Sequence, residues 1–278
     1  MKKRLDTLLV KKGIAQSRER AKAYIIAGSI SVNGETVIKP AMMVDERSLV
    51  NRVLANDGYV SRGGMKLEGA LKDFGIDVNG KRCLDVGAST GGFTHCLLEH
   101  GACSVLALDV GRNLIDYRLR NDRRVTVVEK FNARNLDHLD MEEYGSGGPF
   151  DIVTIDISFI SLRLVLPPLL TIITSDATTL ALIKPQFEIR KPYRGFKGVV
   201  RDPDMHLEVL KSMNDFIFRT GYTAVGYTVS RLRGPKGNVE FFSCIRKTAD
   251  GGLRSRGLQT GGHMKAQIEA LVSRVKDD

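Results

Sequence analysis

The chain has 278 residues, which suffices for one medium-sized domain and a smaller one. Its hydrophobic content of 42% is that of a globular protein, and no apolar run approaches the roughly 20 residues that a membrane-spanning helix needs. Lys and Arg outnumber Asp and Glu by 42 to 32, and the resulting net charge of +10 favours a polyanionic partner.

The first 60 residues predict a compact unit of two short helices and a hairpin. Leucines recur at helical spacing from Leu5 until Gly13 stops the helix, and Ser17 can cap a second helix. Asn33-Gly34 lies between two β-prone runs and is a strong signal for a two-residue hairpin. We therefore expect a small α+β domain at the N-terminus.

Three motifs in this unit resemble the S-four-like RNA-binding domain first seen in a small-subunit ribosomal protein. They are Arg4-Leu-Asp-x-x-Leu-Val-x-x-Gly, Ser17-Arg-x-x-Ala-x-x-x-Ile-x-x-Gly and Val32-Asn-Gly. The resemblance implies that basic side chains of this domain grip RNA phosphates, and the candidates are Lys3, Arg4, Lys11, Lys12, Arg18 and Arg20. The alternative is a structural helix-hairpin cap with a solvated basic face.

Residues 51–60 lack helical periodicity and contain the turn Asn56-Asp57-Gly58. They therefore predict a linker at the end of the small domain (1–60), before a second domain over 61–248. Ser61 can then cap a helix over 64–74.

From residue 82 onward, short apolar runs alternate with helical segments. The runs 82–86, 104–109, 125–129, 151–156 and 179–184 predict buried parallel strands, and 161–172 and 204–219 predict helices. Two further runs, 223–230 and 239–246, flank a Gly-Pro-Lys-Gly turn without a helix between them and predict an antiparallel pair at the sheet edge. This α/β order resembles a class I, Rossmann-like methyltransferase with a mostly parallel sheet and an antiparallel terminal strand.

The first predicted strand ends in Asp85-x-Gly87-x-x-x-Gly91-Gly92, and a helix follows at once. The glycines let the backbone approach a ligand closely, and the helix start offers unpaired N–H groups. The spacing departs from the dinucleotide pattern Gly-x-Gly-x-x-Gly and is similar to that of adenosylmethionine-binding loops. In such loops the first acid can hold the methionine ammonium, directly or through water.

Two later strand ends complete the predicted cofactor site. Asp109 ends the second strand, where a carboxylate can accept both ribose hydroxyls, and on this spacing alone NAD stays possible. Asn132 follows the third strand, where such folds often meet the adenine, although an ordinary loop asparagine fits equally well. The predicted S-adenosylmethionine contacts are Asp85, Gly87, Ser89, Gly91, Gly92, Phe93, Asp109 and Asn132.

Four charged residues lie where strand ends and a flanking helix would aim them at this loop. Asp156 and Lys184 close the fourth and fifth strands, Glu240 stands among apolar residues, and Lys66 lies on the helix before the first strand. In order and element they match the Lys-Asp-Lys-Glu tetrad of FtsJ-like ribose 2′-O-methyltransferases. The resemblance implies that these four residues are catalytic, with Lys184 the best candidate for the general base.

The tetrad and the S-four-like domain occur together with Ser61-Arg-Gly-Gly-Met-Lys-Leu, Ile155-Asp-Ile-Ser-Phe-Ile-Ser-Leu and Ile183-Lys-Pro-Gln-Phe-Glu. This combination, over residues 4–247, is similar to the TlyA family, also called haemolysin A. The resemblance implies S-adenosylmethionine-dependent 2′-O-methylation of cytidine in ribosomal RNA, with ribosomal subunits as partners.

A long basic loop over 186–203 is of the kind that is functional or disordered in compact domains. We expect it to help position RNA, and the additional candidate phosphate contacts are Arg62, Arg190, Lys191, Arg194 and Lys197. The tail over 249–278 is glycine-rich and then helical, with apolar residues at helical spacing.

Three other functions are compatible with parts of the sequence. An RNA-binding assembly factor with a relic methyltransferase core is disfavoured because the tetrad is intact. A cytolysin, as the family's second name implies, is disfavoured by the absence of a signal sequence or an apolar span. A dehydrogenase is disfavoured by the loop spacing and the terminal strand pair. The four cysteines form no metal-binding spacing, so we expect reduced thiols, no metal requirement and a cytoplasmic location.

Overall fold

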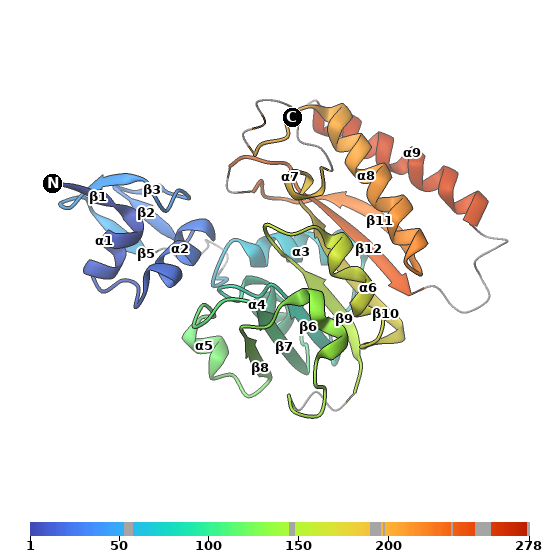
Figure 1. The fold of residues 1–278 in the computed structure, drawn as a ribbon, viewed down its shortest axis with the longest axis horizontal. Coiled ribbons are helices and arrows are strands. Elements are labelled where there is room, and N and C mark those ends of the chain that lie inside the picture. Colours follow the sequence, from blue (N-terminus) through green and yellow to red (C-terminus); the bar gives the residue numbers. More distant parts are fainter. Residues whose placement is uncertain are drawn as a thin grey trace.

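The computed structural model describes residues 1–52, 58–144, 148–189, 196, 198–234, 236–247 and 257–276, and for the last helix it describes the side chains of residues 263–275. A small N-terminal domain lies beside a larger one that contains the central sheet (Figure 1). The small domain has the order β1 (Lys2–Arg4), α1 (Leu5–Lys11), α2 (Arg18–Ile26), β2 (Ile30–Val32), β3 (Glu35–Thr36), β4 (Met43–Asp45) and β5 (Val50–Arg52).

Local signals in the small domain act as predicted. The Ser17 hydroxyl caps α2 by accepting a hydrogen bond from Arg20 N at 3.1 Å. Asn33 and Gly34 both take positive φ, 53° and 89°, and join β2 to β3 as an antiparallel hairpin. A core of leucines, isoleucines and valines closes underneath, with Leu5, Leu9 and Ile25 fully buried.

The predicted linker begins too early. Strand β5 pairs antiparallel with β2, so Asn51 and Arg52 belong to the small domain's sheet. Residues 53–57, which include most of the predicted turn, lie outside the described residues.

In the described residues the larger domain forms a seven-stranded sheet with the order β11-β12-β10-β9-β6-β7-β8. The strands are β6 (Arg82–Val86), β7 (Ser104–Asp109), β8 (Val125–Glu129), β9 (Phe150–Ile155), β10 (Ile173–Ile183), β11 (Tyr222–Val229) and β12 (Phe241–Lys247). The first five run parallel, and β12 lies antiparallel between β10 and β11. This confirms the predicted α/β class, with a mostly parallel sheet and an antiparallel strand at one end.

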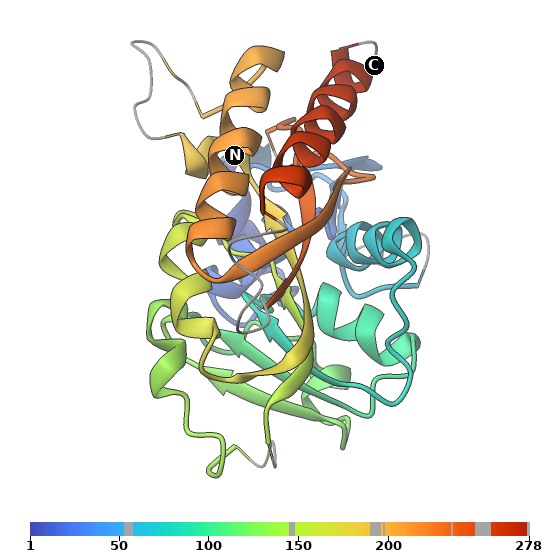
Figure 2. The same ribbon diagram turned by 90° about the vertical axis from the view of Figure 1, so that its right-hand side faces the viewer.

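Helices cover both faces of the sheet, which is why its central strands read as continuous apolar runs (Figures 1 and 2). The helical elements are α3 (Gly63–Phe74), α4 (Gly92–Glu99), α5 (Tyr117–Arg120), η1 (Ala133–His138), η2 (Leu162–Leu164), α6 (Leu166–Leu169), α7 (Pro185–Glu188), α8 (Pro203–Arg219) and α9 (Gly257–Lys276). Helices α3 and α4 pack on one face, and α6, α8 and α9 pack on the other.

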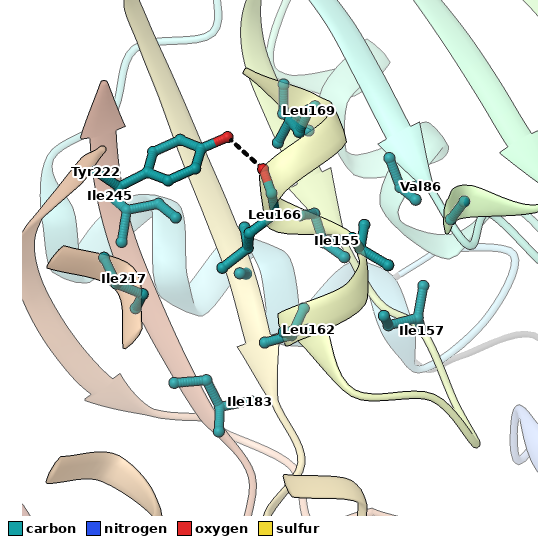
Figure 3. Close-up of a cluster of buried hydrophobic side chains, with 14 of the residues drawn as sticks. Val86, Ile155, Ile157, Leu162, Leu166, Leu169, Ile183, Ile217, Tyr222 and Ile245 are labelled. Carbon is teal, nitrogen blue, oxygen red and sulfur yellow. Dashed lines mark hydrogen bonds between the residues drawn. The ribbon is translucent and has the colours of Figure 1, made fainter. Parts of the chain in front are cut away.

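The second face holds the larger hydrophobic core, part of which Figure 3 shows. Ile155 and Ile183 from the sheet meet Leu166 of α6 and Ile217 of α8, and all four are at most 1% exposed. Tyr222 is also fully buried, and its hydroxyl donates to the carbonyl of Leu166 at 3.0 Å (Figure 3). Burial of this apolar surface, at about 25 cal/mol per Å², fixes α6 and α8 on the sheet.

Two helix predictions need correction. The helix predicted over 161–172 is two short pieces, η2 and α6, because Pro167 and Pro168 are tolerated only in the first turn of a helix and start a new one. Ser61 is also wrong as a helix cap: α3 begins after Arg62, and no side chain caps it. Ser61 instead packs its hydroxyl against the backbone of Gly92.

The C-terminal helix α9 lies alongside α8 at the end of the domain (Figures 1 and 2). Ile268 is fully buried, and Met264 and Val272 are less than 10% exposed within the second-face core. The apolar spacing in the tail therefore reflects packing onto the core of the larger domain.

The two domains touch next to the glycine-rich loop that follows β6. Arg52 of the small domain donates to the Asp116 carboxylate at 2.6 Å, and its guanidinium lies 4.2 Å from the centre of the Tyr24 ring. Asp116 N in turn donates to the carbonyl of Thr90, in the loop itself, at 3.1 Å. No sequence pattern predicts this contact, because it joins residues 64 positions apart in two domains.

Candidate active site

Lys66 and Glu240 form a buried ion pair at the edge between α3 and the sheet. Lys66 Nζ lies 2.6 Å from Glu240 Oε2, and the two residues are 8% and 1% exposed. The amphipathic pattern of α3 turns Lys66 toward the sheet, and Glu240 directly precedes β12. Removal of either residue would leave the other as a buried unpaired charge, which is strongly destabilising.

Lys184 and Asp156 form a second ion pair. Lys184 follows β10, Asp156 follows β9, and Lys184 Nζ lies 2.6 Å from Asp156 Oδ1. The same ammonium donates to the Ser158 hydroxyl at 2.8 Å. Pro185 begins α7 immediately after Lys184, so the chain turns away and leaves the lysine at the carboxyl edge of the sheet.

The two ion pairs make one cluster. Burial would raise the pKa of Asp156, but the charges of Lys184 and Lys66 lower it below its ordinary value. Because both lysines act on one carboxylate, the structure brings together all four residues that the sequence predicted as a tetrad. Which lysine pairs with which carboxylate could not be read from chain order.

Gly234 completes the cluster, and sequence reasoning missed it. A Cβ at this position would come within 2.3 Å of Glu240 Oε1, which is itself buried without a hydrogen-bond partner among the described residues. The Gly-Pro-Lys-Gly turn was the available signal, since glycine often marks a close approach of backbone to a functional group.

The glycine-rich loop lies directly against the tetrad. Gly87, Ser89 and Gly91 have positive φ angles of 87°, 50° and 92°. Glycine adopts this left-handed backbone without strain, which accounts for Gly87 and Gly91. A Cβ on Gly87 would meet the carbonyl oxygen of Asp156 at 2.5 Å. Asp156 N also donates to the carbonyl of Val86 at 3.0 Å, so the start of the loop and the end of β9 are joined through their backbones.

Replacing Gly87 with alanine is expected to displace the loop and lower the free energy of unfolding by about 2–4 kcal/mol, because left-handed strain and a clash with backbone add together. Gly75→Ala is the matched control: φ is 62°, and nothing lies within 4 Å of its Cβ position. We expect the control to cost only about 1 kcal/mol. Chemical denaturation of both variants measures the difference, and equal losses would contradict the clash.

The two loop carboxylates play different parts. Asp85 is fully buried, and its oxygens accept hydrogen bonds from the hydroxyls of Thr94 at 2.7 Å and Thr154 at 3.0 Å. Burial raises the pKa of Asp85 to about 7. Asp109 is half-buried and accepts from the backbone N–H groups of Ser89 at 2.8 Å and Gly111 at 2.6 Å. Asp109 therefore shapes the loop and keeps its carboxylate near the surface.

The remaining predicted cofactor contacts have structural partners of their own. Gly92 starts α4 against Ser61, and Phe93 is 3% exposed and stacks on Phe242 with ring centres 6.0 Å apart. Asn132 is exposed and caps η1 by accepting from Arg134 N. Their contact with a cofactor stays a prediction.

An exposed aromatic residue adjoins the tetrad and was not predicted. Phe159 is 82% exposed and has a φ of 69°, both unusual for phenylalanine. Its ring centre lies 5.2 Å from that of Phe187, which follows Lys184 by three residues. Ser158, which accepts from Lys184, directly precedes it. The Ser-Phe pair after Asp156 was the signal available in the sequence.

Four of the predicted RNA-binding side chains of the small domain form ion pairs, two of them with the buried Asp6 carboxylate. Arg4 and Arg18 lie 2.8 and 3.1 Å from the Asp6 carboxylate, and the hydrogen bond from Arg4 in particular holds the pKa of Asp6 well below its ordinary value. Lys3 and Lys11 share Glu46. The pairs on Glu46 lie at the surface and so contribute little stability, which leaves Lys3 and Lys11 able to exchange Glu46 for phosphate. The Asp6 carboxylate is fully buried and needs a cation beside it.

The other predicted RNA contacts differ in their surroundings. Lys12 donates to the carbonyl of Ser48 at 3.1 Å. Arg20 faces the contact between the domains, and its guanidinium lies 3.4 Å from the carbonyl of Ile115. Arg62 packs over Gly28 and reaches the carbonyl of Arg233. Arg190, Lys191, Arg194 and Lys197 lie outside the described residues.

Comparison with protein-family models matches residues 59–247 to the FtsJ-like methyltransferases and residues 3–50 to the S4 domain. The chain belongs to the FtsJ-like methyltransferase family, as a member of its TlyA branch. Membership of the TlyA branch rests on relatives that match along almost the whole chain. TlyA of Mycobacterium tuberculosis, described as a 16S/23S rRNA (cytidine-2′-O)-methyltransferase, is 42% identical over 94% of this chain and 96% of its own length.

Other members of the family carry a different name. Hemolysin A of Brachyspira hyodysenteriae is 40% identical over 86% of this chain and 98% of its own length. A solved structure from Streptococcus thermophilus, also named a hemolysin, is 34% identical, covers 100% of this chain and 99% of its own, and superposes with a TM-score of 0.69. Across the described residues, none of the helices has the length and apolar character needed to cross a membrane.

Proposed function

We propose that this protein transfers a methyl group from S-adenosylmethionine to the ribose 2′-hydroxyl of a cytidine in ribosomal RNA, presented within a ribosomal subunit in the cytoplasm. The observation that carries the proposal is the cluster of Lys66, Asp156, Lys184 and Glu240 beside a glycine-rich loop. The naming of the relatives as rRNA cytidine-2′-O-methyltransferases supports the substrate.

The residues at the carboxyl end of β7 fit the nucleoside part of S-adenosylmethionine. Each Asp109 oxygen accepts one backbone N–H, which leaves lone pairs for the two ribose hydroxyls. Val110 is 72% exposed beside it and offers an apolar surface to a base. Gly87, Ser89 and Gly91 would hold the cofactor through backbone. The tetrad needs no metal in this proposal.

When bound, S-adenosylmethionine supplies a methyl group activated by a sulfonium. The 2′-oxygen gains that methyl group as the methyl–sulfur bond breaks and a neutral thioether leaves. The 2′-oxygen also loses its proton, which we assign to the neutral form of Lys184. Asp156 and Ser158 hold Lys184 Nζ between them, and Glu240 holds Lys66. Such positioning accounts for much of the rate in a reaction between two bound groups.

Phe159 is expected to support the target base. Replacing it with alanine removes a stacking surface and should weaken RNA binding by about 1–3 kcal/mol, because base–aromatic stacking has this magnitude. Phe159→Tyr keeps the ring and is the matched control. Because Phe159 is 82% exposed, neither change should lower the melting temperature. Filter binding of a substrate RNA fragment measures the effect, and equal affinity of both variants would contradict a stacking role.

Labelled methyl transfer tests the function itself. Ribosomal subunits from a strain that lacks the gene are incubated with the protein and S-adenosylmethionine, and the modified ribose is mapped by primer extension at low nucleotide concentration. We expect one discrete stop at a cytidine. Absence of transfer to any subunit while S-adenosylmethionine still binds would favour the assembly-factor interpretation.

A further inference from the structure

A basic cavity of about 300 Å³ lies at the start of α8, apart from the glycine-rich loop. Its walls come from the segment before α8, the turn between β11 and β12, and the last turns of α9. Valines form the apolar part, and the polar part consists of Arg201, His206, Arg233 and Lys236. The cavity is thus built from three segments that lie far apart in the sequence.

The charge of the cavity favours an anion. Arg201, Arg233 and Lys236 line it, and no carboxylate does. In the described part of the chain none of these three side chains has an ion-pair partner. The nearest acid in sequence, Asp202, caps α8 by accepting from Asp204 N at 2.9 Å. Unlike the paired cations of the small domain, these three are available to a ligand.

His206 supplies an independent sign of a ligand. The residue lines the cavity and is 2% exposed, yet its Nδ1 has no hydrogen-bond partner among the described residues. The other ring nitrogen, Nε2, lies 3.2 Å from the carbonyl of Val200 and donates to it. Buried polar atoms nearly always have a partner, so an unpartnered one in the wall of a cavity points to a missing group. With Nε2 as a donor, Nδ1 accepts a hydrogen bond in the neutral ring and donates one to an anion only in the protonated ring.

The cavity wall is fixed with respect to the tetrad. Asn238 Oδ1 accepts from Val200 N and its Nδ2 donates to the carbonyl of Gly198, both at 2.9 Å. Val239 lines the cavity, and the next residue is Glu240 of the tetrad. On the facing turn Arg233 lines the cavity while Gly234 touches Glu240. In both segments, therefore, a residue that lines the cavity is directly followed in the chain by a residue of the catalytic cluster.

We propose that this cavity binds a backbone phosphate of the substrate RNA, from a nucleotide next to the methylated one, and so sets which ribose reaches Lys184. The inference rests on the proposed function and adds a subsite to it. Two arginines and a lysine match phosphate, since guanidinium groups bind it through paired N–H donors and lysine acts as a point charge. The apolar floor would accommodate the adjoining sugar.

The test uses the double variant Arg201→Ala/Lys236→Ala, whose side chains are both exposed and whose removal should leave the fold intact. The control is Arg123→Ala/Arg219→Ala, which removes the same charge from an exposed turn and from the opposite end of α8. We expect the cavity variant to bind a substrate RNA fragment about tenfold more weakly and to lower the salt slope of binding by about one, as loss of one phosphate contact predicts. The control should match the unaltered protein in slope.

A second measurement does not depend on methyl transfer. Titration of the full chain with inorganic phosphate should shift the imidazole NMR signals of His206, and the shift should be lost in the cavity variant but kept in the control. An unmoved His206 signal, or a cavity variant with the salt slope of the control, would overturn the proposal. If the protein methylates no RNA but phosphate still moves His206, the proposed function fails and the anion site stands.

Discussion

Replacing Lys184 with alanine is expected to lower methyl transfer to ribosomal subunits about 10³-fold, in the range typical of a lost general base. Binding of S-adenosylmethionine should change little, because Lys184 contacts Asp156 and Ser158 and not the glycine-rich loop. The variant should stay folded, since Lys66 still compensates the Asp156 carboxylate. Single-turnover transfer of labelled methyl, with calorimetric titration of the cofactor, measures both quantities.

Lys184→Arg separates the two parts that a lysine can play here. Arginine keeps a positive charge beside Asp156, but its guanidinium does not lose a proton under these conditions. If Lys184 accepts the proton of the ribose hydroxyl, the arginine variant is as inactive as the alanine variant. Substantial activity in Lys184→Arg would show instead that the charge alone matters and would refute the assignment as base.

The parallel strands could be predicted because both faces of the sheet are covered, which leaves short apolar runs between turns. β6, β7 and β8 have the predicted bounds. β10 begins at Ile173, six residues before the predicted start, and shifts its register between Ile173 and Thr178. The residues between are partly exposed and mostly polar, so they do not read as a buried strand, and they form the irregular stretch across which the pairing with β9 changes register.

The tetrad could be predicted in part for a similar reason. Residues that end parallel strands meet at one edge of the sheet, which placed Asp156 and Lys184 together. The pairing of Lys66 with Glu240 joins residues 174 positions apart and depends on β12 entering between β10 and β11. His206 and the cavity around it left no pattern in the sequence, since three separate segments form it.

Asp85 lies where the sequence placed it, at the end of β6, but in a buried setting that the sequence did not indicate. By likeness to adenosylmethionine-binding loops, the sequence predicted that this acid holds the methionine ammonium, directly or through water, and that contact stays a prediction. The structure buries the carboxyl completely under the loop, with Thr94 and Thr154 as its hydrogen-bond donors. A carboxyl in such a place favours its neutral form, and burial raises its pKa from 3.8 to about 7.

The raised pKa of Asp85 makes folding stability depend on pH. Between pH 4 and 7 the folded state keeps this proton while the unfolded state has lost it, so stability falls as pH rises through this window. Above pH 7 both states are ionised, and the loss is complete. A difference between 3.8 and about 7 corresponds to at most about 4 kcal/mol.

Asp85→Asn removes the ionisation and keeps a carbonyl to accept from Thr94. The variant is therefore expected to be more stable than the unaltered protein at pH 8, by up to about 4 kcal/mol, and to gain progressively less toward pH 4. Asp122→Asn is the control: the hydrogen bond from Arg124 holds the pKa of Asp122 at about 2, so its contribution is constant from pH 5 to pH 8. Denaturant titrations at several pH values measure both, and parallel pH profiles for the two variants would refute the prediction. The Asp85→Asn variant also tests whether Asp85 contacts the cofactor. We expect its affinity for S-adenosylmethionine to stay within about threefold of that of the unaltered protein. Loss of a charged hydrogen bond to the methionine ammonium would instead lower the affinity about tenfold or more.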